Sequence, residues 1–408
     1  MSALRDRRFR LLLTGGALSN FGDTALYLAL AIWVKELTDS NGAAASVFLA
    51  LGLPALLSPA GGHLVDRVRH RRRLLMTTDA VTGCVVLSLL FVHSRSEIWI
   101  IYAVAAAYGL SATVVGPATS GLMKDLLPDG ELGSANAARQ TLNQGLRLLA
   151  PLAGAGLYTA FGGGTVAVLD AVTFGCSILL VSAVRMTESP VENAADQPTF
   201  LRRVVAGFVH IRETPLLLRI TVSTGVAMLS IGLFEPVVFA VIAAIHQRPS
   251  FLGVVVCVQG AGSILGGLAV TRVLHRLGEA RTLGLGLAGL AVGAGGMVLP
   301  VLPLVLTCSG VLGVGLSFFV VAFGTAIQRG TPPRLLGRVS AASDVLTTVP
   351  QTMSIAVGAA LINFVDYRIL LGIIVTATLS CGVSLMRYGR RAVLVPAPVA
   401  VDQVASSS

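Results

Sequence analysis

The stretch Gly61-Gly-His-Leu-Val-Asp-Arg-Val-Arg-His-Arg-Arg-Arg-Leu-Leu75 places a dense basic loop between two long apolar runs. Five arginines and one aspartate fall within residues 66–73. The flanking runs, 43–65 and 74–92, are each long enough to cross a bilayer, which takes about 20 apolar residues. A short basic loop between two spans is typical of a cytoplasmic connection. We therefore expect a polytopic membrane protein whose loop at 66–73 faces the cytoplasm.

The composition of the whole chain supports a membrane protein. Of its 408 residues 54% are hydrophobic and 12% are charged, and the mean hydropathy is +0.81. A soluble domain carries about 25% charged residues. The net charge of +10 lies in short loops between apolar runs, which favours a lipid bilayer as partner and argues against nucleic acid.

The apolar runs predict an all-α chain with twelve transmembrane helices. With the N-terminus in the cytoplasm, most of the 30 lysines and arginines fall in cytoplasmic segments. Both termini are then cytoplasmic, as the positive-inside rule requires. The predicted spans are 11–34, 43–65, 74–92, 98–123, 134–160, 165–186, 215–245, 250–274, 282–300, 302–328, 338–364 and 368–387.

The chain divides into two halves that resemble each other. Gly62 and Gly266 are 204 residues apart, and so are Gly154 and Gly358. A parallel repeat of six helices is a transporter architecture with its substrate site between the repeats. We expect a six-helix bundle over 1–186, a cytoplasmic linker over 187–214, a second bundle over 215–390 and a disordered tail over 391–408.

The sequence carries no recognisable catalytic or cofactor motif. The only lysines, Lys35 and Lys124, do not belong to a P-loop. The five cysteines lie one each in separate apolar runs, without metal-ligand spacing. We expect no enzyme activity, no metal and no cofactor.

The motifs resemble those of the major facilitator superfamily. Gly62-x-Leu-x-Asp66-Arg67-x-x-x-Arg71 resembles its signature between spans 2 and 3, with Arg69 where a glycine is usual. The stretch from Lys124 to Asn136 is similar to the drug/proton antiporter branch that holds macrolide-efflux and enterobactin-exporter-type proteins. The resemblance implies a bacterial cytoplasmic membrane protein in which spans 1, 4, 7 and 10 line the cavity.

Two acidic residues within spans are the first candidates for a transport mechanism, because ionisable groups in a bilayer are costly. Asp23 lies near the middle of span 1 and shares a helical face with Asn20 and Tyr27. Asp23 is expected to bind a coupling proton or a cationic substrate; the alternative is a hydrogen bond that packs helices. Glu235, before Pro236 in span 7, is interpreted as a proton carrier or as a capped kink.

Polar residues on other spans are candidates for the cavity wall. Asn143 and Arg147 share one stripe of span 5, with Gln144 beside it. Arg147 needs an anion, either a carboxylate such as Asp23 or a substrate group. The remaining cavity candidates are Met228 on span 7 and Gln351 on span 11. Three further aspartates near or within spans are interpreted as structural: Asp79, Asp170 and Asp344.

The loop between spans 2 and 3 is interpreted as a conformational gate. By resemblance, Asp66 faces the start of span 11, where a helix N-terminus favours a carboxylate. Arg67 or Arg71 is expected to pair with Asp125 at the end of span 4. These contacts are expected only when the cytoplasmic side is closed. The alternative is a topological anchor, which explains Arg69, Arg72 and Arg73 but not Asp66.

Together these features predict a monomeric secondary transporter that works by alternating access. The favoured function is proton-coupled export of hydrophobic small molecules or antibiotics. The alternatives are a proton-coupled importer or facilitator of a small metabolite, and a non-transporting membrane receptor or assembly partner.

Overall fold

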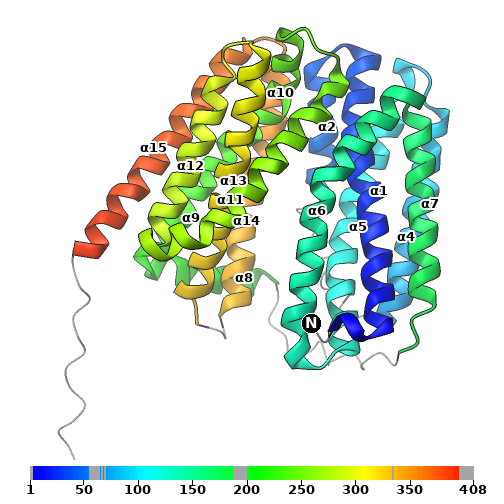
Figure 1. Cartoon of the computed structure of the whole chain (residues 1–408), viewed down its shortest axis with the longest axis horizontal. Coiled ribbons are helices and arrows are strands. Elements are labelled where there is room, and N and C mark those ends of the chain that lie inside the picture. The colour runs from blue at the N-terminus through cyan, green and yellow to red at the C-terminus, as the bar shows by residue number, and fades with distance from the viewer. Residues whose placement is uncertain are drawn as a thin grey trace, which may run out of the picture.

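The computed structural model describes residues 3–54, 65, 68, 70–186, 200–332 and 335–394, and these residues form helices joined by short turns (Figure 1). Eight helices in this part of the chain are long and apolar enough to cross a membrane. Twelve crossings and the cytoplasmic placement of both termini remain predictions. The helices of the first half are α1 (Arg7–Thr38), α2 (Asn41–Gly52), α4 (Arg71–Leu87), α5 (Ile98–Leu126), α6 (Asp129–Phe161) and α7 (Gly163–Ser182).

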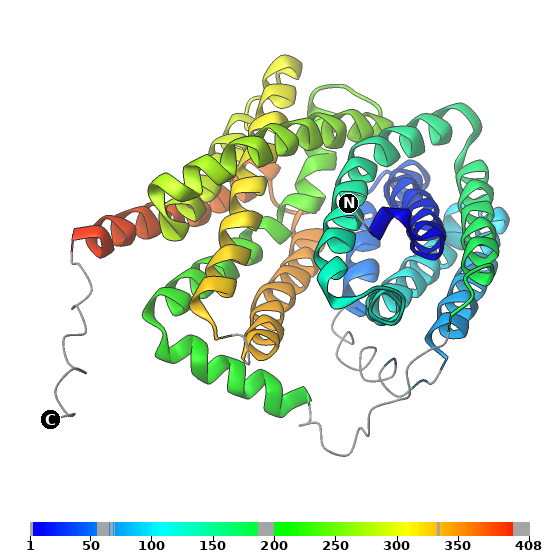
Figure 2. The same ribbon diagram turned by 60° about the horizontal axis from the view of Figure 1, so that its bottom comes forward.

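The second half begins after a short helix, α8 (Phe200–Glu213), whose last turn carries His210 and Arg212. Its remaining helices are α9 (Pro215–Gly232), α10 (Phe234–Ala244), α11 (Leu252–Leu277), α12 (Glu279–Gly296), α13 (Leu302–Gly330), α14 (Leu336–Leu361) and α15 (Tyr367–Leu394). Figures 1 and 2 show the two halves as neighbouring groups of helices.

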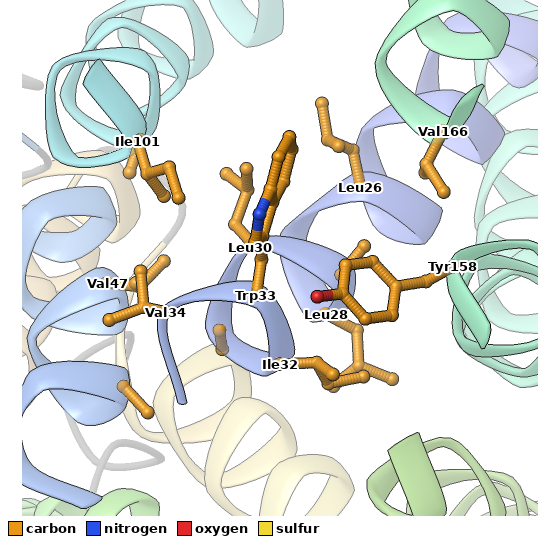
Figure 3. Packing of buried hydrophobic residues seen from close by; sticks show 14 of the residues in the cluster. Leu26, Leu28, Leu30, Ile32, Trp33, Val34, Val47, Ile101, Tyr158 and Val166 are labelled. Carbon is orange, nitrogen blue, oxygen red and sulfur yellow. The ribbon is translucent and has the colours of Figure 1, made fainter. Parts of the chain in front are cut away.

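Helix α1 runs through the first group and is apolar nearly all round. Asp6 caps its N-terminus by accepting a hydrogen bond from the Arg8 backbone amide at 2.7 Å. The Arg8 side chain bonds to the same carboxyl and lowers the pKa of Asp6 below its ordinary value. Leu26, Leu30 and Ile32 are fully buried among the surrounding helices (Figure 3). Residues 28–35 of this helix are all buried, and a segment buried on all sides has no face for lipid, which suits a central position.

Contacts between the two groups gather at the end of the helices remote from the N-terminus. There α2 packs on α10 and α14, and α6 packs on α11. Gly42 of α2 lies against the Ala359 backbone of α14, and Gly253 of α11 lies against Ala155 of α6. Toward the end that holds the N-terminus the two groups diverge (Figure 1). At the contact end, small residues such as Gly42 and Gly253 permit the close approach of helices.

One pair of repeat-related glycines makes equivalent contacts. Gly154 on α6 lies against the Ala25 backbone of α1, and Gly358 on α14 lies against Leu233 and Pro236 at the α9–α10 junction. Gly154 thus lets α6 approach α1, and Gly358 lets α14 approach the junction of α9 and α10. These two positions thus make comparable contacts, and the division of the chain into two repeats remains a prediction.

The structure differs from the sequence-based expectations at three places. The linker range contains helix α8, which buries Val204 and Ile211 against Val339 and other residues of the second half. Span 7 is broken at Leu233, three residues before Pro236, into α9 and α10. Helix α15 continues to Leu394, past the expected end of the second bundle at 390. Residues 187–199 and 395–408 lie outside the described residues.

Candidate functional site

A cavity of about 280 Å³ opens among five helices of the first half: α1, α4, α5, α6 and α7. Apolar side chains form much of its wall, including Phe9, Val115 and Phe174. Its polar side chains include Asn20, Asp23, Tyr27, Asp79, Arg139 and Asn143. Four of the predicted site residues, Asn20, Asp23, Tyr27 and Asn143, thus line one cavity.

Asp23 presents a carboxylate oxygen to this cavity without a hydrogen-bond partner. Its Oδ1 is buried, and no described residue donates a hydrogen bond to it. One turn away on α1, the Asn20 Nδ2 donates a 3.2 Å hydrogen bond to Asn143 Oδ1 on α6. A buried polar atom without a partner costs about 1–3 kcal/mol. Either a proton or a ligand group would relieve that cost.

Asp170 lies beside Asp23, although it is on a different helix. It is fully buried on α7, where Tyr108 of α5 donates a hydrogen bond to its Oδ2. The Thr173 hydroxyl lies 3.2 Å from its Oδ1. Gly22 makes this approach possible, because a Cβ at that position would collide with Asp170 Oδ1 and Thr173 Oγ1. Asp170 therefore reaches the α1 backbone immediately next to Asp23.

A third carboxyl group, that of Asp79, faces the same region from α4. Asp79 is 3% exposed, and its Oδ2 accepts a 2.8 Å hydrogen bond from Ser177 Oγ on α7. Asp79 and Asp23 thus line the same cavity from two different helices. Among the described residues, no set of three or more His, Cys, Asp and Glu residues is arranged to hold a metal ion.

Aromatic rings connect the carboxyl groups. Tyr27 and Tyr108 meet edge to face, with ring centroids 4.9 Å apart. Tyr108 also stacks on Phe174, at 6.2 Å between centroids. Sequence reasoning missed Tyr108 and Asp170 as members of the site. An aspartate in an apolar run was the available signal for Asp170, but the peripheral position implied for span 6 led to a structural interpretation.

The other predicted site residues lie elsewhere or are not described. Met228 packs against the core of the second half. The cavity is not lined by Met228, Gln351 or Glu235. Glu235 begins α10 beside the helix break, and no hydrogen bond or ion pair to it is found within the described part of the chain. The side chains of Gln144 and Arg147 are outside the described residues, so the expected pairing of Arg147 remains a prediction.

The expected pair between Arg71 and Asp125 is present. Arg71 Nη1 lies 3.5 Å from Asp125 Oδ2, and the Arg71 side chain crosses Gly121 of α5. This pair joins α4 to α5 within the first half, and it exists while the two halves diverge at this end (Figure 2). It therefore does not require closure, contrary to the expectation. Gly62, Asp66 and Arg67 lie outside the described residues.

Comparison with known proteins places this architecture in a family. The model of the Major Facilitator Superfamily matches residues 12–342. The uncharacterized MFS-type transporter YfiS of Bacillus subtilis is 24% identical over 393 residues, covering 93% of this chain and 90% of YfiS. The multidrug efflux pump Tap of Mycobacterium tuberculosis is 25% identical, covering 78% of each chain. Macrolide efflux protein A of Enterococcus faecalis is 21% identical, covering 70% of this chain and 90% of that protein.

Solved structures share the fold. A bacterial homologue of the iron transporter ferroportin in its inward-facing state has a TM-score of 0.72 at 16% identity, covering 94% of this chain and 98% of that one. The outward-facing state with soaked iron has a TM-score of 0.59 at 17% identity, covering 93% and 98%. Since the family model covers most of the sequence, the chain belongs to the Major Facilitator Superfamily and is a multi-pass membrane transporter.

Proposed function

We propose that this transporter exports hydrophobic small molecules from a bacterial cell in exchange for protons. The observation that carries the proposal is the unpartnered carboxylate oxygen of Asp23 in a cavity that also faces Asp79. Efflux pumps among the relatives, Tap and macrolide efflux protein A, support the direction of transport. The protein resides in the bacterial inner membrane.

The grouping of carboxyl groups supports a proton as the coupling ion. Like charges at close range disfavour simultaneous ionisation, so such a group holds a proton that can be exchanged. Asp23 contacts the cavity, whereas Asp170 lies behind it and is held by Tyr108 and Thr173. We assign the exchangeable proton to Asp23 and a positioning role to Asp170. Ionisable groups inside a membrane commonly serve such relays.

The cavity wall supports a substrate with a large apolar part. A drug-sized ligand occupies a pocket of about 300–1,000 Å³, and the cavity of about 280 Å³ is at the lower limit of that range. A larger substrate therefore also needs surface from the second half. Met228 on α9 and Gln351 on α14 remain candidates for that surface, because both helices belong to the second half. Glu235 on α10 remains a candidate for a second proton carrier.

We further propose a monomer with twelve spans and both termini in the cytoplasm, and the arrangement of the halves supports alternating access. The halves meet at one end and diverge at the other, and the TM-score is higher for the inward-facing than for the outward-facing ferroportin homologue. We assign this form as inward-facing. The gate on the divergent side would be formed by Asp66, Arg67 and Gly62. The ion pair between Arg71 and Asp125 would hold α4 to α5 next to this gate.

Proton flux in proteoliposomes tests this function. Purified protein is reconstituted with a pH-sensitive dye inside, and erythromycin and ethidium are supplied as probes. We expect a probe-dependent pH change that disappears with a protonophore and in Asp23→Asn. Asp39→Asn is the control, because the Asp39 carboxylate is exposed at the end of α1. Probe movement without proton movement would contradict antiport; proton movement in the same direction as the probe would indicate symport.

A further inference from the structure

A second recess, separate from the transport cavity, lies between α9 and α15 of the second half. Its volume is about 900 Å³, and it is open to the outside of the helix group. Residues of α15 form most of its wall, and Arg219 of α9 forms the opposite edge. The transport mechanism proposed above uses none of these residues.

The wall contributed by α15 changes from apolar to basic along its length. Val375, Leu379, Val383 and Arg387 follow one another at four-residue intervals, so they form a continuous line on one face of the helix. At 1.5 Å per residue, the line from 375 to 387 is about 18 Å long. One leaflet of a bilayer's hydrocarbon core is about 15 Å thick. The apolar part of the line, from Val375 to Val383, is about 12 Å long, so it runs along most of one leaflet.

Two hydroxyl groups in the apolar part of the recess do not oppose an apolar occupant. The Thr376 hydroxyl donates to the Gly372 carbonyl oxygen at 2.7 Å, and the Ser380 hydroxyl donates to the Ala377 carbonyl oxygen at 2.9 Å. Side chains that bond back to their own helix have satisfied their donor. These two hydroxyl groups therefore need no hydrogen-bond acceptor from a lipid chain.

Two arginines stand at the basic end of the recess without a carboxylate partner among the described residues. Arg219 lies over the ring of Tyr388, with its guanidinium carbon 4.5 Å from the ring centroid. This position occupies a face of the guanidinium and leaves the in-plane N–H groups free to donate. Arg387 lines the same end of the recess. Paired guanidinium groups are well suited to phosphate oxygens.

We propose that this recess binds an anionic phospholipid, with one acyl chain along Val375, Leu379 and Val383 and the phosphate at Arg219 and Arg387. The lipid belongs to the leaflet on the side of the N-terminus, where α9 begins and α15 ends (Figure 1). Basic pockets between helices on the cytoplasmic side commonly take anionic headgroups. Charge complementarity and the length of the apolar line select this occupant.

Native mass spectrometry of the purified full-length protein tests the proposal, with phosphatidylglycerol, phosphatidylcholine and inorganic phosphate as three separate probes. We expect Arg219→Gln with Arg387→Gln to weaken phosphatidylglycerol binding about 10- to 30-fold. The matched control is Arg272→Gln with Arg276→Gln, which removes the same charge from the exposed end of α11. Equal losses in both double variants would overturn the proposal, because they would indicate general charge attraction.

Two further comparisons separate a seated lipid from a bare phosphate. Ser380→Phe fills the recess and is expected to weaken phosphatidylglycerol binding, whereas Ile373→Phe, on the exposed surface outside the recess, is expected to leave it unchanged. Unchanged binding in Ser380→Phe, or equally strong binding of phosphatidylcholine or inorganic phosphate by the unmodified protein, would overturn the proposal. The Ser380→Phe result decides the matter if the arginine variant does not fold. None of these measurements depends on transport.

Discussion

Tyr108 on α5 donates a hydrogen bond to the buried carboxylate of Asp170 on α7, and the ring of Tyr108 meets Tyr27 one turn from Asp23. This contact joins three helices around the Asp23 carboxylate. Tyr108 is 1% exposed, so water does not replace the contact easily. The phenol of Tyr108 therefore holds one carboxylate oxygen of Asp170, while Thr173 holds the other.

Removing that phenol should weaken the helix group and alter the proton exchange. Tyr108→Phe keeps the ring but leaves one carboxylate oxygen of Asp170 without this donor. We expect a loss of about 1–3 kcal/mol in the free energy of unfolding, together with a shift in the pH profile of transport. Thermal melting and transport from pH 5 to 9 measure the two effects. Tyr102→Phe, which removes a hydrogen bond to the Ala43 carbonyl oxygen near α2, is the control. A lower melting temperature with an unchanged pH profile would assign Tyr108 to folding alone.

Replacing Asp23 by asparagine should separate proton coupling from substrate binding. Asparagine resembles the protonated acid in shape but cannot release a proton. We expect Asp23→Asn to lose probe-dependent proton flux while it retains exchange of labelled probe for unlabelled probe across the membrane. Proton flux and exchange are measured on the same proteoliposomes. Persistence of proton flux at the original level would remove Asp23 from the coupling mechanism.

Gly22 should tolerate no side chain, because of the neighbouring helix. The Cβ of Gly22→Ala would collide with Asp170 Oδ1 and Thr173 Oγ1, whereas no atom of another helix lies within 4 Å of a Cβ at Gly16. Overpacking of this kind costs about 1–3 kcal/mol. We expect Gly22→Ala to melt at a lower temperature and to transport less, whereas Gly16→Ala, on the same helix, is expected to melt at the temperature of the unmodified protein. Equal melting temperatures of the two variants would contradict the close contact between α1 and α7.

The sequence identified the residues whose signal is local, and it missed those whose role depends on packing between helices. Asp23 stood out because a charge within an apolar run is costly, and Asn20 and Asn143 were found by helical spacing. The Asn20–Asn143 hydrogen bond then joins these two stripes. Asp170 carried the same local signal as Asp23, but its position beside Asp23 depends on Gly22, a contact between α1 and α7 that no spacing along one helix encodes. The helix at 200–213 was missed, although Val204, Phe208 and Ile211 recur at the i, i+4, i+7 spacing of an amphipathic helix, because the acidic residues and prolines before it favoured a polar linker.

The Arg71–Asp125 pair should stabilise the first half without controlling the opening of the transporter. The Arg71 side chain is 20% exposed and that of Asp125 is 5% exposed, and both residues belong to the first half. A double-mutant cycle with Arg71→Gln and Asp125→Asn should give a coupling energy of about 1 kcal/mol, since the pair is only partly removed from water. Thermal melting measures the stability, and labelling of a cysteine on the divergent side measures the opening. Changed labelling in Arg71→Gln would restore the gating role expected from the sequence.

A cross-link between the halves at their contact end should stop transport. The Gly253 Cβ position on α11 lies 2.5 Å from the Ala155 Cβ on α6, and the halves must part there for the outward-facing form to open. In a background whose five native cysteines are replaced by serine, Ala155→Cys with Gly253→Cys places two thiols within reach of a disulfide after small backbone movement. We expect oxidation to abolish probe transport and a reductant to restore it, with each single-cysteine variant insensitive to both treatments. Mass spectrometry verifies that cross-linking is complete. If transport continued after complete cross-linking, this contact would persist through the cycle and the halves would rotate about a different axis.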